Sequence, residues 1–180
     1  MTSYVLLADR FLIAVVFGVA FIGKIAGATA FRQFAATVRQ LTRFPEPVVT
    51  GIAAFIVLGE AATVALLVLP GTTGWGFTLA IGLLVLFIGV VARAIQAGVL
   101  VECRCFGRGS VMTSAMILRN LLIIAVAVIG LVLSPGEPIG DLGYAAVAAL
   151  VGLAGAAFFI RYYDALVRVV LGRLAPQVEA

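Results

Sequence analysis

Two cysteines are the residues of this chain with the most distinctive chemistry. Cys103 and Cys105 are the only cysteines in 180 residues, and a single residue separates them. Neighbouring thiols can form a disulfide, but the small ring of a C-x-C pair strains the preferred disulfide geometry. Strained, exposed disulfides are the labile and catalytic ones. The pair therefore predicts thiol–disulfide exchange. A structural disulfide, cysteines without a redox role and a loosely held soft metal such as Cu(I) are the alternatives.

Basic residues surround this pair. Arg104 lies between the cysteines, and Arg93 and Arg119 flank the segment from the adjoining apolar runs. Positive charge increases the fraction of a thiol present as thiolate, which is the reactive form. Arg93 and Arg119 each lie roughly 8 Å inside an apolar run. Their simpler role is to extend to the membrane interface.

The residues next to the cysteines give the segment its shape. Phe106 and Gly107 follow Cys105, and glycine permits a tight turn. Glu102 precedes the pair and opposes the effect of the arginines. We expect Cys103 to attack and Cys105 to be the more buried thiol.

The composition indicates that these residues are held by a membrane protein. Hydrophobic residues make up 64% of the chain, charged residues 11%, and the mean hydropathy is +1.25. A soluble domain has about 45–50% apolar and about 25% charged residues. The chain contains no histidine, which excludes Ser-His-Asp and Cys-His catalysis and His-ligated zinc. The net charge of +4 is scattered along the chain, unlike the basic patch of a nucleic-acid-binding protein.

Five stretches are long and apolar enough to cross a bilayer, which takes about 20 helical residues. They are residues 4–24, 48–69, 75–97, 113–133 and 142–161. Proline and glycine separate several of them, as at Pro70-Gly71. We predict an all-α, polytopic integral membrane helical bundle of about five transmembrane helices. It forms a single membrane domain over residues 1–180, and its first span is retained rather than cleaved as a signal peptide.

Two further segments are amphipathic. In residues 29–44, apolar side chains recur at three- and four-residue spacing, while Arg32, Arg39 and Arg43 lie off that stripe. This pattern predicts an interfacial helix on an anionic leaflet. The tail, residues 161–180, has a similar pattern. Anchoring to membrane lipid is the expected role of both.

The distribution of Lys and Arg predicts the orientation. The first loop, the third loop and the C-terminal tail hold every basic residue except Arg10 and Arg119, and the second and fourth loops hold none. The positive-inside rule then places the N-terminus outside the cell membrane. The C-x-C loop and the C-terminus are predicted to be cytoplasmic.

Charged residues inside the spans predict a second, intramembrane site. Arg10 lies 14 residues before Lys24, about 21 Å from the cytoplasmic side, and Glu60 lies about 18 Å from that side. The matching depths predict an Arg10–Glu60 pair. Such a pair either lines a polar site for a substrate, a proton or a quinone head group, or fixes helix packing.

A stripe of small residues lies on the fifth span. It consists of Ala145, Ala149, Gly152 and Ala156. Small residues let helices approach closely. We expect packing within the chain, with a homodimer interface as the alternative.

The cysteine segment also carries a family resemblance. Cys103-x-Cys105-Phe106-Gly107 at the end of one span, with Arg119-Asn120 early in the next, resembles the MauE family of methylamine utilisation proteins. That family lies within a wider MauE/DoxX group of redox-associated membrane proteins. Additional matches are Arg10, Gly23-Lys24 and Leu58-Gly59-Glu60. The resemblance covers about residues 5–133 and implies a DoxX-like four-helix core plus one helix.

The resemblance implies thiol–disulfide chemistry with a thioredoxin-like protein or another protein thiol or disulfide. In methylamine metabolism it implies maturation of the disulfide-rich small subunit of methylamine dehydrogenase, and DoxX-like relatives imply a quinone as cofactor. Such maturation occurs outside the cytoplasmic membrane, whereas the charges predict a cytoplasmic C-x-C loop. Electron transfer across the bilayer, a cytoplasmic partner and a failure of the charge rule are the three ways to reconcile the two.

Two other function classes stay open. One is a small proton-coupled transporter, with Glu60 as the proton-binding carboxylate. The other is a non-catalytic membrane assembly subunit. Replacement of both cysteines, set against replacement of Glu60, separates the three hypotheses.

Overall fold

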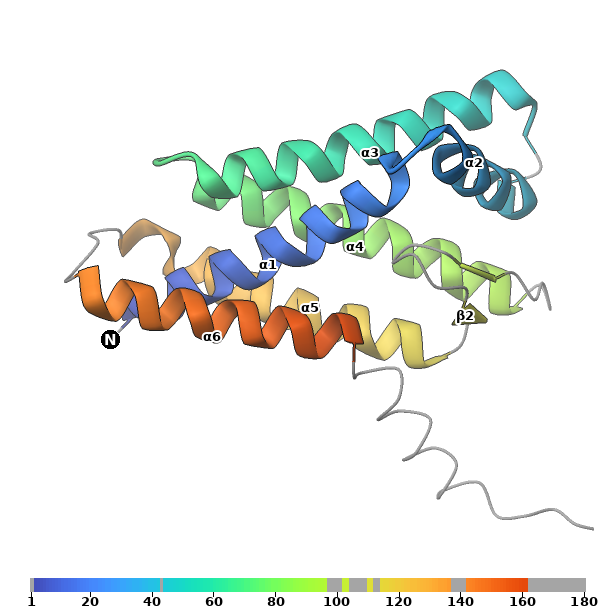
Figure 1. Ribbon diagram of the computed structural model, residues 1–180. Helices are drawn as coiled ribbons and strands as arrows, with labels where there is room; N and C mark the ends of the chain where they lie inside the picture. The colour runs from blue at the N-terminus through green and yellow to red at the C-terminus, as the bar shows by residue number, and fades with distance from the viewer. Residues whose placement is uncertain are drawn as a thin grey trace, which may run out of the picture.

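The computed structural model describes residues 2–42, 44–96, 102–103, 110–111, 114–136 and 142–161. Within them lie α1 (Thr2–Ile25), α2 (Ala28–Thr42), α3 (Glu46–Val68), α4 (Thr73–Gln96), β1 (Glu102–Cys103), β2 (Ser110–Val111), α5 (Ser114–Leu133), η1 (Ser134–Gly136) and α6 (Leu142–Arg161) (Figure 1). The five predicted spans and the predicted amphipathic helix coincide with helices to within two residues at each end. The helical membrane bundle is therefore confirmed.

The limits of α3 show how the sequence defines its helices. Pro45 is the N-cap residue, and the acidic Glu46 occupies the first turn. At the other end Leu69 is extended, and Gly71 has a φ of +78°, a conformation that favours glycine. The hydroxyl of Thr72 donates to the carbonyl oxygen of Leu66 at 2.7 Å. This bond satisfies one of the carbonyl groups that a helix end leaves open.

Among the residues that the structure describes, three helices are long and apolar enough to span a membrane. These segments are Ser3–Ile25, Glu46–Val68 and Thr73–Arg93, with hydropathies of 2.4, 2.2 and 2.4. In α5 and α6 the apolar segments are shorter, Ile117–Leu133 and Ala146–Phe158. Three of the predicted crossings thus have the length and composition of a span, and the fourth and fifth stay predictions.

Helix α1 is the centre of the bundle. It packs against α6, α3 and α5, and α4 packs against α3 and α5 (Figure 1). Buried side chains of α1, such as Ile13 and Phe17, form one core cluster with Phe77 of α4 and Ile123 of α5. Large apolar side chains also lie on the outer surface, where Phe55 is 69% exposed. An apolar exterior of this kind is expected of a protein surrounded by lipid.

Small residues bring α6 against α1. Ala148, Gly152 and Ala156 are buried at four-residue steps. A Cβ atom on Gly152 would lie 2.4 Å from the carbonyl oxygen of Ala8. The predicted small-residue stripe therefore serves packing within the chain at Gly152 and Ala156, while Ala149 is only half-buried.

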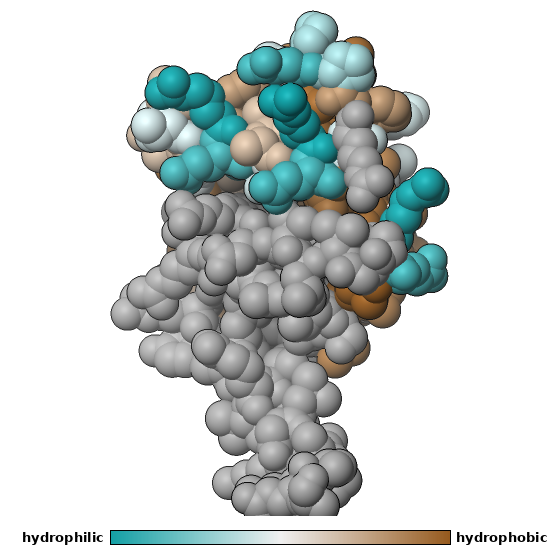
Figure 2. All heavy atoms as spheres, turned by 90° about the vertical axis from the view of Figure 1, so that its right-hand side faces the viewer, coloured by the Kyte–Doolittle hydropathy of each residue, from teal (hydrophilic) through white to brown (hydrophobic). Residues whose placement is uncertain are grey.

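Helix α2 covers one end of the bundle. Figure 2 shows hydrophilic side chains gathered over this end, where Arg32, Gln33, Arg39 and Gln40 are exposed. The opposite face of α2 packs against α3 and α1. Its apolar stripe therefore contacts the protein, and the predicted interfacial position on an anionic leaflet stays a prediction.

Candidate functional site

The cysteine segment connects α4 to α5 through a short antiparallel pairing. Glu102 of β1 lies opposite Val111 of β2, and Cys103 lies opposite Ser110. The sequence pattern gave no indication of these strands. Cys105, Arg104, Phe106 and Gly107 lie outside the described residues, as does the tail beyond Arg161.

The predicted supporting residues of the adjoining helices have different environments. Arg93 is exposed in the last turn of α4. Arg119 and Asn120 lie near the start of α5 and are only 4% and 3% exposed. Arg119 is therefore covered by other parts of the protein, and its extension to the membrane interface stays a prediction. It lies inside the bundle at the same end as the cysteine segment.

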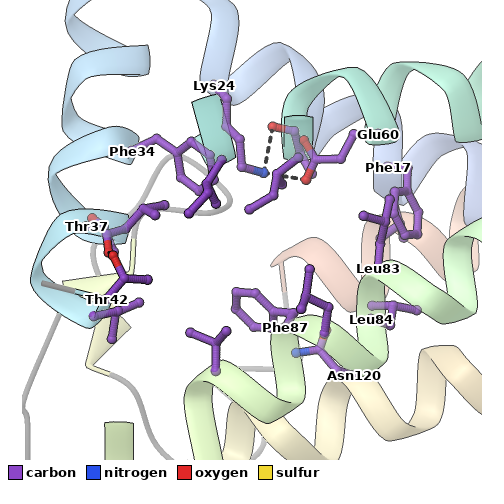
Figure 3. A pocket seen from close by; sticks show the side chains of 18 residues that line it. Phe17, Lys24, Phe34, Thr37, Thr42, Glu60, Leu83, Leu84, Phe87 and Asn120 are labelled. Atoms are coloured by element: carbon purple, nitrogen blue, oxygen red, sulfur yellow. Dashed lines mark hydrogen bonds and ion pairs between the residues drawn. The ribbon is translucent and has the colours of Figure 1, made fainter. Parts of the chain in front are cut away.

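A buried ion pair joins α1 to α3 at that end. The Nζ atom of Lys24 lies 2.5 Å from Oε1 of Glu60, and the two residues are 4% and 7% exposed (Figure 3). Lys24 also donates to the carbonyl oxygen of Ala20 at 3.5 Å. Its Nζ lies 5.0 Å from the centre of the Phe34 ring, within the range of a cation–π contact. The two charged groups are thus buried and in contact with each other.

The predicted Arg10–Glu60 pair is wrong. Arg10 donates through Nε to the carbonyl oxygen of Leu67, and through Nη2 to those of Val68 at 2.8 Å and Leu69 at 3.3 Å. These carbonyl groups end α3, where a helix has open acceptors and a partial negative charge. Arg10 thus caps α3 from a neighbouring helix.

The direction of helical side chains explains this error. Side chains in an α-helix project toward its N-terminus. The Lys24 ammonium consequently reaches back one turn to the level of Ala20, deeper than its backbone, and there meets Glu60. The Arg10 guanidinium projects the opposite way relative to Glu60, toward the end of α3. The depths predicted for Arg10 and Glu60 were counted along the backbone, and they therefore ignored the distance by which each charged group is displaced from its own Cα atom.

Lys24 belongs to this buried pair, although its position in the sequence led to the expectation of a loop charge. One feature of the sequence could have indicated that Lys24 is buried. It is the only lysine in the chain, and it directly follows the first apolar run. A helix that continues to Ile25 buries it.

The ion pair lines a cavity of about 410 Å³ between the helices. Its wall includes Val16 and Phe17 of α1, Phe34, Val38 and Leu41 of α2, Ile52 and Ile56 of α3, Leu83, Leu84 and Phe87 of α4, and Asn120 of α5 (Figure 3). Most of this wall is apolar. Most of its lining residues belong to α2 and to the halves of α1, α3, α4 and α5 that lie toward the β1–β2 connection, as the course of the helices in Figure 1 shows.

The part of the chain that contains this site matches a known protein family. The model of the methylamine utilisation protein MauE matches residues 2–133. The chain belongs to the MauE family. The matched region contains the cysteine segment and both members of the Lys24–Glu60 pair, and it ends at the last residue of α5. The predicted resemblance is confirmed, and the chain is a membrane protein of the methylamine utilisation type.

No curated protein and no solved structure matches the chain. Helix α6 lies beyond the matched residues.

Proposed function

We propose that this MauE-family protein exchanges electrons with protein thiols and disulfides through Cys103 and Cys105. The observation that carries the proposal is that both cysteines of the chain fall in one short connection of the family-matched region. Cys103 lies in β1, directly before the part of the connection that contains Cys105. The residues that could assist are those at the same end of the bundle.

The proposed exchange has two steps. The thiolate of Cys103 attacks a disulfide of the partner, which forms a mixed disulfide and releases one partner thiolate. The thiolate of Cys105 then attacks the Cys103 sulfur, which forms the Cys103–Cys105 disulfide and releases the second partner thiolate. Two electrons pass to the partner. The reverse sequence oxidises a partner dithiol.

Neighbouring residues have proposed supporting roles. Arg104 and the exposed Arg93 favour the thiolate form, and Arg119 adds positive charge from inside the bundle. Phe106 and Gly107 shape the turn around the pair, and Asn120 lies beside Arg119 in the sequence of α5. Glu60 pairs with Lys24 of α1 and Arg10 caps α3, and neither residue takes part in the proposed exchange.

The proposed partner is a thioredoxin-like protein or another disulfide-containing protein, such as methylamine dehydrogenase. The proposed location of the cysteine segment is the cytoplasmic side. That orientation does not depend on Lys24, which Glu60 neutralises, because the first loop keeps Arg32, Arg39 and Arg43. A quinone in the membrane is the candidate for the second electron carrier.

Trapping of the mixed disulfide tests the proposal. In cells that carry out methylamine utilisation, the Cys105→Ser variant should accumulate a covalent complex through Cys103, and reductant should dissolve it. The Cys103→Ser/Cys105→Ser variant should form no complex and should abolish the redox function. Ser110→Ala is the matched control, because Ser110 lies opposite Cys103 and has no thiol. Full function of the double variant at normal expression would refute the proposal.

Labelling with a membrane-impermeant maleimide tests the side of the membrane. Inverted vesicles should label and intact cells should not, and reductant should increase the labelling. Labelling from intact cells alone would reverse the proposed orientation. Labelling that reductant leaves unchanged would contradict a reversible disulfide.

A transporter is the second candidate, because Glu60 lines a cavity. In that case transport should survive the double cysteine replacement and be lost with Glu60→Gln. A protein that tolerates both changes would be an assembly subunit.

A further inference from the structure

The cavity beside the Lys24–Glu60 pair has the dimensions of a small-molecule site. Its volume of about 410 Å³ lies in the range of ligand pockets, about 300–1,000 Å³. Such pockets are mostly apolar and hold a few polar groups that orient the ligand. Here the apolar wall comes from four helices and the charged pair lies at its edge (Figure 3). The proposed thiol chemistry makes no use of this space.

Most polar groups of the wall are already engaged by the protein. The hydroxyl of Thr37 donates to the carbonyl oxygen of Gln33 at 3.1 Å, and that of Thr42 donates to Val38 at 2.9 Å. The Lys24 ammonium contacts Glu60 and Ala20. These three residues therefore offer few hydrogen-bond donors to a ligand.

The second carboxylate oxygen of Glu60 differs from these groups. Oε2 of Glu60 is buried and has no hydrogen-bond partner among the described residues, while Oε1 binds Lys24. A buried carboxylate oxygen without a donor is costly. The group that fits it must donate a hydrogen bond.

The charges of the site limit the ligand further. Lys24 and Glu60 cancel each other, so a cationic ligand would add an uncompensated charge to an apolar cavity. Burial of such a charge is strongly unfavourable. A neutral donor avoids that cost, and an apolar body matches the side chains of Phe17, Leu84 and Phe87.

We infer that the cavity between α1, α2, α3 and α4 binds a neutral lipophilic molecule whose hydroxyl group donates to Oε2 of Glu60. The hydroxyl belongs either to an aliphatic alcohol or to an aromatic alcohol such as a hydroquinone. The shared chemistry is one hydroxyl donor on an apolar body. This inference goes beyond the cysteine chemistry and needs neither Cys103 nor Cys105.

Photolabelling of the full chain in lipid nanodiscs tests the inference. The probe is an octanol with a diazirine, and the labelled residues are mapped by mass spectrometry. Label should concentrate on residues of the cavity wall. 1-Nonanol should compete about ten-fold or more better than methyl octyl ether, which cannot donate, because a hydrogen bond to a charged group is worth roughly that ratio. Equal competition by the alcohol and the ether would overturn the inference.

An alkylated hydroquinone forms a second competition arm. Stronger competition by the hydroquinone than by nonanol identifies an aromatic source, and the reverse identifies an aliphatic one. Failure of both hydroxyl compounds to compete would overturn the inference.

A pair of variants controls for location. Ile56→Trp fills the cavity and should reduce cavity labelling at least five-fold. Phe55→Trp adds a similar side chain one residue away on the exposed surface, and it should leave labelling unchanged. Equal effects of the two variants would contradict a site in the cavity.

Glu60→Gln tests the acceptor itself. When the amide oxygen accepts from Lys24, the amide N–H₂ replaces Oε2 and can donate to an ether. The preference for nonanol over the ether should therefore fall to about two-fold or less, and a retained preference would exclude Glu60 as the acceptor. The comparison of alcohol with ether on the unaltered chain decides the inference even if this variant does not fold.

Discussion

Two faces of α1 pack against their neighbours by opposite means. Toward α3 it presents long charged side chains, Lys24 to a carboxylate and Arg10 to backbone carbonyl groups. Toward α6 it presents backbone, which the missing side chain of Gly152 allows to approach closely. The contact with α3 depends on charged side chains, and the contact with α6 depends on the lack of a side chain at Gly152. Substitutions should therefore affect them by different mechanisms and to different extents.

Removal of Lys24 should have the largest effect on the charged face. Lys24→Met leaves the buried Glu60 carboxylate without its cation, and loss of one partner of a buried pair costs about 3–5 kcal/mol. The expected result is a large fall in the free energy of unfolding, measured for the purified protein in detergent by thermal unfolding.

The double variant Lys24→Met/Glu60→Met is the control for this prediction. Two apolar residues can replace a buried ion pair at little or no cost. The double variant should regain most of the stability. If Lys24→Met were as stable as the unaltered chain, the pair would not contribute to stability in the way that its burial indicates.

The helices of this fold could be predicted from the sequence, because apolar runs of about 20 residues with Pro and Gly between them admit few alternatives. The partner of Glu60 could not be predicted. It depends on the direction in which Lys24 and Arg10 project and on the position of α1 relative to α3, which sequence spacing does not contain.

The candidate sites show the same division. Cys103 and Cys105 could be identified from residue type and spacing alone. The cavity could not, because its wall combines residues from five helices, and the role of α2 as part of that wall became visible only in three dimensions.

Substitution of Arg10 should cause the second largest loss of stability. Arg10→Met removes the donors from the last carbonyl groups of α3, and hydrogen bonds of charged groups contribute about 1.5–3 kcal/mol. The loss should be smaller than for Lys24, because these carbonyl groups lie at an exposed helix end where other donors can reach them. Thermal unfolding in the same detergent measures the difference.

Arg10→Lys separates the charge from the geometry of this contact. A lysine keeps the charge but lacks the planar fork that serves several acceptors at once. It should recover only part of the loss. If Arg10→Met cost more than Lys24→Met, Arg10 would have to hold more than the end of α3.

The face toward α6 should respond to the addition of a single methyl group. Gly152→Ala places a Cβ atom 2.4 Å from the carbonyl oxygen of Ala8 and 2.9 Å from Cβ of Phe11. The nearest obstacle is backbone, so α6 must move away from α1, and overpacking of this kind costs about 1–3 kcal/mol. Gly82→Ala is the matched control, because nothing lies within 4 Å of the added atom there and alanine favours a helix. Thermal unfolding should show a loss for Gly152→Ala and none for Gly82→Ala. Equal behaviour of the two variants would mean that α6 moves away from α1 at little cost, and that the close approach at Gly152 does not contribute to stability.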